Sequence, residues 1–317
     1  MPDAVHRVTT RDAIETGIAK WNERHEAFAI PADIVAQNVF APFAGVTVSA
    51  WALEGDPETG FALGKRPTDA QGPYPAGSTA WISLAVAPDR ERTIRLLEGL
   101  TSRLARDSVE TVAFGRGPQH IVPGIPTTLS GYLRAALRAA QFTFGDRVVD
   151  MTQRLATAET PPSVAETRAT WECRLERATE NSADLFSVLA HFGERWQYEA
   201  ENVARLPGGL STYWVLYADD EAVGFLRAST PESTFQAPGR TWANRVDESV
   251  VGIGPLGIRP DARGQGWGLA MIDAVLDHYH ECGIERAVVD WTDLRTYYRK
   301  LGFDPWIEYE YAERSLL

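Results

Sequence analysis

The chain has 317 residues, of which 44% are hydrophobic and 23% are charged, and its formal net charge is −12. This length suggests two globular domains, and the composition excludes a disordered, collagen-like or coiled-coil protein. The acidic balance argues against a nucleic-acid binder that relies on a basic face. Cys173 and Cys282 form no CxxC pair, so we expect no metal site and no disulfide. No long uncharged apolar run occurs, so we expect a soluble cytoplasmic protein without a membrane partner.

The first half of the chain predicts alternating helices and strands. A helix over 10–26 is followed by a hairpin within 45–65 and a strand over 78–88. The remaining expected elements are a helix at 92–107, a strand at 110–115, a helix at 131–142 and a strand at 146–155. A polar segment with two prolines, 156–170, follows and predicts a linker. We therefore expect one domain over 1–157 and a second over 168–317.

The second half has the same order of elements. A strand is expected at 171–178, a helix within 182–205, a hairpin at 211–229 and a long loop over 231–248. A buried strand at 250–258, a glycine-rich turn, a helix to residue 281 and strands at 287–291 and 305–313 complete the chain. Phe235 and Trp242 in the loop fit either the wall of a ligand pocket or a plug on the core. Both halves predict mixed α/β (α+β) domains.

A glycine-rich turn stands between a strand and a helix in the second half. Residues 263–268 read RGQGWG, and three glycines in five residues let an anion approach the backbone closely. The helix that follows presents unpaired amide groups and a positive dipole end. Leu269 stands where a dinucleotide fold needs its third glycine, and no Lys follows as in a P-loop. The turn therefore predicts a phosphate cradle of another kind, or a tight turn without a ligand.

Three motifs in this order resemble the Gcn5-related N-acetyltransferase (GNAT) superfamily. Residues 263–268 fit the pattern [RQ]xxGx[GA], residues 297–303 (YYRKLGF) fit [FY]YxKxGF, and residues 256–260 (LGIRP) look like the LxVxP strand end. The chain is similar to bacterial tandem GNAT proteins. This resemblance implies two tandem GNAT-like domains, each with a mixed, splayed β-sheet flanked by helices, and acetyl-CoA as co-substrate without a metal.

The resemblance also implies a role for individual residues. Tyr298 falls where the family places the general acid, and an ordinary tyrosine pKa of about 10 keeps it protonated at neutral pH, although a packed core aromatic fits the same position. The strand end is expected to pair with pantetheine and the turn to hold the pyrophosphate. The implied cofactor-binding residues are Leu256, Gly257, Ile258, Arg259, Arg263, Gly264, Gln265, Gly266, Trp267, Gly268 and Leu269.

Two departures from the family pattern affect the general base. Trp291 stands where members often have an Asn, and residues 250–258 contain no carboxylate. Glu248 and Asp290 are the nearest candidates, Asp293 and Glu199 are weaker ones, and a chain of ordered waters is the alternative. Each of these carboxylates also fits a solvated or capping role.

The first half resembles a degenerate GNAT copy without a cofactor loop. Residues 84–89 (LAVAPD) share the pattern Lx[VI]xPD with 256–261, but the following residues 90–93 contain no Gly, and Leu137 takes the position of Tyr298. We therefore expect an acyl-CoA-dependent N-acyltransferase that acts on a primary amine, either a small molecule or a peptide. The alternative is a non-catalytic acyl-CoA-binding or interaction module, and an oxidoreductase built on the turn is more remote. The acceptor and the oligomeric state are not decided by the sequence.

Overall fold

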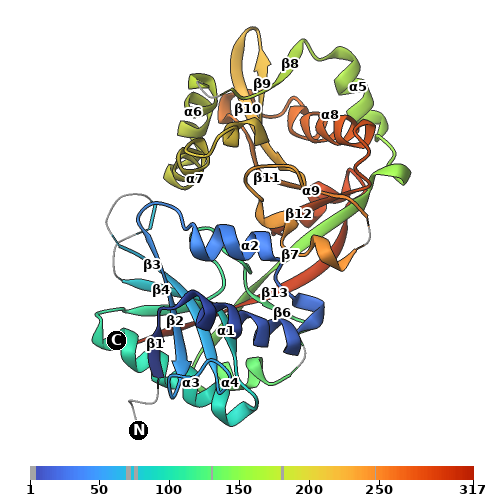
Figure 1. The fold of residues 1–317 in the computed structure, drawn as a ribbon. Helices are drawn as coiled ribbons and strands as arrows, with labels where there is room; N and C mark the ends of the chain where they lie inside the picture. Colours follow the sequence, from blue (N-terminus) through green and yellow to red (C-terminus); the bar gives the residue numbers. More distant parts are fainter. Residues whose placement is uncertain (1–4, 69–72, 75–77, 130, 180–181, 247) are drawn as a thin grey trace. The chain divides into compact units, whose positions relative to one another are not determined.

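The computed structural model describes residues 5–68, 73–74, 78–129, 131–179, 182–246 and 248–317. The chain divides into two compact units, which are traced in sequence colours in Figure 1. Unit 1 comprises the residues up to Val148 together with Ile307–Leu317, and unit 2 comprises Val149–Trp306. Each unit combines helices with strands that pair in both parallel and antiparallel ladders, so the predicted mixed α/β (α+β) class is confirmed. No helix in the described ranges is long and apolar enough to cross a bilayer.

Unit 1 contains the helices and strands that the first half predicts, together with three short elements that were not expected, β1, α2 and β6. In chain order they are β1 (Val5–Val8), α1 (Arg11–Arg24), α2 (Ala32–Val35), β2 (Val46–Leu53), β3 (Phe61–Pro67), β4 (Thr79–Val86), α3 (Arg90–Arg106), β5 (Thr111–Phe114), β6 (Ile125–Pro126), α4 (Leu133–Ala139) and the start of β7 (Thr143–Arg154). The apolar stripe of α3 is buried, with Leu96, Leu97 and Leu100 fully inaccessible. Burial of such a stripe is what fixes an amphipathic helix on a sheet.

Unit 2 also follows the predicted order. Its elements after β7 are α5 (Pro162–Thr170), β8 (Cys173–Arg177), α6 (Ala183–Leu189), α7 (Glu194–Ala204), β9 (Tyr213–Ala218), β10 (Glu221–Ser229), β11 (Val250–Ile258), α8 (Trp267–Glu281), β12 (Arg286–Thr292), α9 (Arg295–Arg299) and the start of β13 (Asp304–Ser315). The single helix expected within 182–205 is two helices. Gly193, with φ of 89°, interrupts it, because that left-handed conformation cannot continue an α-helix.

The segment 156–170 is not a linker. Residues Pro162–Thr170 form α5, which packs on α8. Arg168 donates to Asp273 at 2.6 Å, and the Thr160 hydroxyl donates to the same carboxylate at 3.1 Å. The two prolines explain the difference, since Pro is favoured in the first turn of a helix, where its missing N–H has no partner to lose. The proline pair therefore starts a helix here.

Strands β7 and β13 each contribute residues to both units. In unit 1 the order is β1-β2-β3-β4-β5-β13, and in unit 2 it is β7-β12-β11-β10-β9-β8. The second half of β7 pairs with β12, for example Met151 with Val289, although most of the chain before it belongs to unit 1. The second half of β13 pairs with β5 of unit 1, for example Ala312 with Phe114. The domain ranges expected from the sequence, 1–157 and 168–317, differ from these units. The boundaries of the units depend on strand pairing, which the apolar periodicity of the sequence does not reveal.

The core of unit 2 fixes the start of α8. Ala270, Met271, Ile272 and Val275 of this helix are fully buried in one apolar cluster with residues of β11 and β12. Ile253 of β11 belongs to the same cluster. Packing of the first turns of α8 on these strands sets the helix N-terminus close to the end of β11, where the glycine-rich turn joins them.

Candidate functional site

β11 leaves its neighbour β12 halfway along its length. The parallel ladder pairs Val250–Ile253 with Arg286–Val289, whereas on the other side β11 stays paired with β10 as far as Ile258. Beyond Ile253 the edge of β11 that faced β12 has no ladder partner in the described part of the chain. The sequence GPLG (254–257) begins at this point. An open strand edge offers backbone N–H and C=O groups to an extended ligand.

The glycine-rich turn adopts the conformations that its glycines allow. Gly264 and Gly266 have φ of 88° and 78°, which side-chain-bearing residues rarely adopt. Gly266 is the residue before α8, and among the residues that the structure describes no side chain caps the first turn of that helix. Residues 263–266 are exposed. The first amides of α8 therefore point to open space, which is the arrangement that binds a phosphate at a helix N-terminus.

The arginines beside the turn are already paired. Arg259 forms ion pairs with Glu221 and Asp261, and these carboxylates raise its pKa further. Arg263 donates its Nε to the carbonyl oxygen of Ile258 at 2.9 Å. Since both side chains are held by the protein itself, the anion-binding capacity of this turn depends mainly on backbone N–H groups.

Two adjacent tyrosines on α9 lie in different places. The Tyr298 side chain is buried, 6% exposed, and packs edge-to-face on Phe303 at 5.9 Å between ring centroids. Burial raises its pKa well above the ordinary value, and Tyr297, Asp290 and Asp293 add to the shift, so the phenol stays protonated. Tyr297 instead reaches the start of α8. A Cβ placed on Gly268 would stand 2.5 Å from its hydroxyl, so a side chain at position 268 would require Tyr297 to shift.

The two carboxylates predicted as bases lie at different ends of β11. Asp290 is half-buried, and its Oδ1 stands 3.7 Å from the point that a Cβ on Gly254 would occupy, so it lies where the strands separate. Glu248 precedes the paired end of β11 and accepts two hydrogen bonds from Arg286, at 2.8 and 3.1 Å. Those bonds lower its pKa, with a smaller contribution from Arg154. A carboxylate held in this way accepts a proton poorly.

A buried arginine on β10 was not identified from the sequence. Arg227 is 2% exposed and donates its Nε to the Gly254 carbonyl oxygen at 3.1 Å. Its Nη1 lies 3.6 Å from Glu199 of α7. The guanidinium also stacks over Phe235, which is buried with Trp242, so the loop 231–248 covers this cluster. The sequence signal that could have identified this cluster is the single Arg within the apolar strand VGFLRAS (223–229), because a buried charge needs polar or charged partners.

In unit 1 a carboxylate closes the corresponding helix end. Asp89 is the N-cap of α3, and its Oδ1 accepts the Arg92 backbone N–H at 2.8 Å. That bond is the main reason that the pKa of Asp89 is lowered. The capped α3 N-terminus contrasts with the open start of α8, and Leu137 is fully buried in the core of unit 1.

Comparisons with known proteins agree with this geometry. The profile of the Acetyltransferase (GNAT) family matches residues 175–303. A fungal GH3 β-N-acetylglucosaminidase whose structure contains a GCN5-related glucosamine N-acetyltransferase region aligns with 98% of the chain, at a TM-score of 0.78 and 15% identity. The chain spans only 38% of that larger protein.

Two further structures align over nearly their whole length. A tandem GNAT protein from the clavulanic acid biosynthesis pathway matches at a TM-score of 0.64 and 12% identity, over 98% of each chain. A GCN5-related N-acetyltransferase from Sphaerobacter thermophilus matches at a TM-score of 0.64 and 13% identity, over 99% of this chain and 96% of that one. Comparison with the sequences of curated proteins returns no match. The chain thus carries a GNAT-family acetyltransferase domain in residues 175–303 and has the fold of tandem GNAT proteins.

Proposed function

We propose that unit 2 transfers an acyl group, in the simplest case acetyl, from acyl-CoA to a primary amine. One observation carries the proposal: the open edge of β11 leads directly to the N-terminus of α8, which no described side chain caps. A buried tyrosine with a raised pKa, Tyr298, belongs to the same apolar cluster as Ile253, the last residue of the ladder with β12. The match of residues 175–303 to the GNAT family supports the same activity.

The residues present fit acyl-CoA as a co-substrate. In this proposal the amides of Gln265–Leu269 hold the pyrophosphate, because none of the described side chains caps α8 and the turn before it is exposed. The backbone of Leu256–Arg259 pairs with the pantetheine arm along the open edge, as a peptide adds to a sheet. Bound there, the co-substrate supplies a thioester carbonyl that an amine can attack.

The proposed chemistry uses Tyr298 as the acid and Asp290 as the base. The amine nitrogen bonds to the carbonyl carbon, a backbone N–H near Leu256 or Ile258 stabilises the oxyanion, and the C–S bond then breaks. Tyr298 gives its proton to the leaving sulfur and regains one from solvent. Asp290 takes the proton that the amine loses, since it is the half-buried carboxylate at the opening of the strands. Glu248 remains a weaker candidate because Arg286 holds it as an anion.

The acceptor is proposed to enter beside the Arg227 cluster. Glu199 and Arg227 adjoin the opening of β11, since Arg227 contacts the Gly254 carbonyl directly. Glu199 is therefore the second candidate for binding or deprotonating a cationic amine. An amino sugar is the first acceptor to test, because the fungal structure of the same fold is described as a glucosamine N-acetyltransferase region.

The test is thiol release from acetyl-CoA in the presence of a panel of amino sugars, aminoglycosides, small amines and peptides with free N-termini. We expect at least one class to release CoA and Asp290→Asn to lower turnover by about a hundredfold or more. Glu248→Gln is the matched control, with the same charge change in the same unit, and its turnover should stay close to that of the unmodified protein.

A non-catalytic acyl-CoA-binding module is the second candidate function. The observation in its favour is that β11 carries no carboxylate and that the nearest one along the chain, Glu248, is held by arginines. In that case acetyl-CoA would raise the melting temperature, but no amine would release thiol. In either case we propose that unit 1 binds no acyl-CoA at its α3 N-terminus, where Asp89 already caps the amides and would repel a pyrophosphate.

A further inference from the structure

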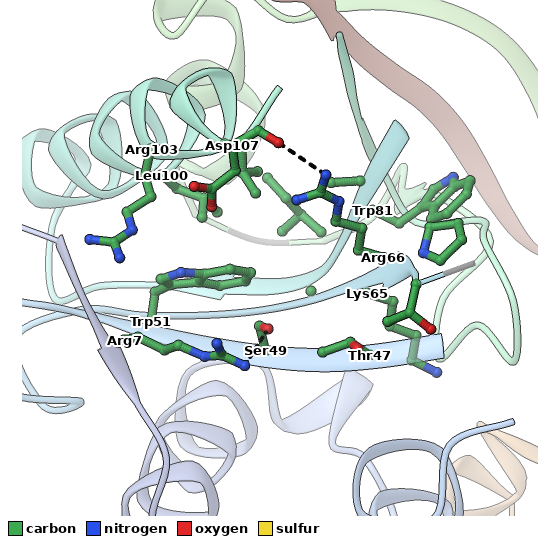
Figure 2. A pocket seen from close by; sticks show the side chains of 16 residues that line it. Arg7, Thr47, Ser49, Trp51, Lys65, Arg66, Trp81, Leu100, Arg103 and Asp107 are labelled. Atoms are coloured by element: carbon green, nitrogen blue, oxygen red, sulfur yellow. Dashed lines mark hydrogen bonds between the residues drawn. The ribbon is translucent and has the colours of Figure 1, made fainter. Parts of the chain in front are cut away.

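Unit 1 contains a cavity of about 410 Å³ that is separate from the glycine-rich turn and its degenerate counterpart (Figure 2). It lies between one face of strands β1–β4 and the C-terminal end of α3, from Leu100 to the C-cap residue Asp107. The capped N-terminus of α3, at Asp89, is at the other end of that helix. The volume is within the range of small-molecule sites.

The cavity exists because two small residues face each other on the sheet. Ser49 of β2 pairs with Gly64 of β3, and a Cβ on Gly64 would stand 3.1 Å from the Trp51 ring and 2.8 Å from the Trp81 carbonyl oxygen. The Trp51 indole, which is 8% exposed, forms one wall. Buried apolar side chains of β4 and α3, among them Ile82 and Leu100, complete the interior. The inner surface therefore suits an apolar or aromatic body.

Cationic groups line the same cavity. Arg7, Arg66 and Arg103 come from β1, β3 and α3, respectively, whereas Asp107 is the only carboxylate among the lining residues. Arg7 donates to the Ser49 hydroxyl at 3.2 Å, and Arg66 donates to the Asp107 backbone oxygen at 3.0 Å (Figure 2). Neither Arg7 nor Arg103 forms an ion pair with any residue that the structure describes. The chain as a whole has a net charge of −12, whereas the three guanidinium groups make the lining of this cavity net positive.

Guanidinium groups bind planar carboxylates and phosphates through paired N–H donors. An apolar interior below cationic groups therefore selects a small molecule with an anionic group on an apolar or aromatic body. We propose that this cavity of unit 1 binds such an organic anion, a carboxylate or a phosphate monoester, independently of the acyl-CoA site proposed for unit 2.

Isothermal titration calorimetry on the full chain tests the proposal with four probes: phenyl phosphate, benzoate, inorganic phosphate and benzyl alcohol. Phenyl phosphate or benzoate should bind at a single site, more tightly than either inorganic phosphate or benzyl alcohol, because the cavity supplies both charge and apolar contact. Which of the two anions binds more tightly distinguishes the phosphate ligand from the carboxylate ligand. Added salt should weaken this binding, since it screens the arginines.

Two variants on α3 provide the matched comparison. Arg103→Gln removes a lining guanidinium and should weaken the organic anion about tenfold, the loss expected for one charge-assisted hydrogen bond. Arg106→Gln makes the same charge change on the same exposed helix end but outside the lining, and should leave affinity unchanged. Circular dichroism checks that both variants are folded.

Three results would overturn the proposal: no binding of either organic anion at millimolar concentration, equal weakening by Arg106→Gln, or competition between the bound anion and acetyl-CoA. Equal weakening would mean that binding depends only on the net charge of the protein and not on the residues that line the cavity. Competition would place it at the glycine-rich turn of unit 2.

Discussion

Gly268 and Tyr297 provide a quantitative test of the structure around the start of α8. In Gly268→Ala the new Cβ would stand 2.5 Å from the Tyr297 hydroxyl, about an ångström closer than an ordinary contact. Such overpacking costs about 1–3 kcal/mol, whereas replacing Gly by Ala in a helix gains up to about 1 kcal/mol. We therefore expect this variant to lower the free energy of unfolding by about 1–2 kcal/mol.

Tyr297→Phe should reverse the sign of that effect. Without the hydroxyl, the nearest atoms to the new Cβ are Ile258 Cγ1 at 3.6 Å and the ring carbon Cζ at 3.7 Å, which are ordinary contacts. In this background Gly268→Ala should be neutral or slightly stabilising, because only the helix-propensity gain remains. The coupling free energy between the two positions should then be about 1–3 kcal/mol.

Urea denaturation of the parent chain, the two single variants and the double variant gives that coupling. Calorimetry with CoA gives a second readout, since Gly268 belongs to the proposed cradle: Gly268→Ala should weaken CoA, and the added Tyr297→Phe should restore it. A double variant as unstable as Gly268→Ala alone would refute the contact between Tyr297 and the start of α8.

Three other predictions concern individual side chains. Tyr298→Phe should lower turnover by about 10²–10⁴-fold with little change in acetyl-CoA affinity, whereas Tyr297→Phe should leave turnover nearly unchanged. An equal loss of turnover in both variants would show that Tyr298 is not the acid. Because burial raises the pKa of Tyr298, turnover should show no loss from its ionisation below about pH 10. Glu248→Gln should lower the free energy of unfolding by about 1 kcal/mol at neutral pH. A carboxylate with a lowered pKa stabilises the fold above its ordinary pKa, so this difference should disappear as the pH falls below about 4, and a constant difference in urea titrations would contradict the ion pair with Arg286. His25 packs against Trp21, with the ring centroids 4.5 Å apart, and burial lowers the pKa of its imidazole to about 4. Between about pH 6.5 and pH 4 the unfolded chain then binds more protons than the folded chain. The free energy of unfolding should therefore fall by up to about 3 kcal/mol as the pH is lowered through this range, and His25→Gln should reduce this pH dependence.

The sequence predicted those parts of the fold that depend on local patterns. The helix α8 and the strand β11 follow from apolar periodicity, and the turn between them from glycines that adopt positive φ at Gly264 and Gly266. The opening of β11 was also foreseeable, because GPLG interrupts the strand pattern at the residue where the ladder with β12 ends.

Features that depend on contacts distant in sequence were not predictable. Arg227 and Glu199 approach each other only through the packing of α7 on the sheet, so no spacing rule connects them. The helix α5 was missed because a proline pair both breaks and starts helices. The cavity of unit 1 depends on the register that sets Ser49 opposite Gly64 and on an arginine from each of three elements.

The division of β7 and β13 between the two units has a consequence for folding during synthesis of the chain. Unit 1 contains the residues up to Val148, yet the segment of β13 that pairs with β5 is made only after unit 2. During translation the β5 edge therefore stays unpaired until residues Asp304–Ser315 have left the ribosome, although domains usually complete folding in the order of their synthesis. An exposed strand edge invites pairing with other chains, so nascent chains and C-terminally truncated forms should be the species most prone to aggregate.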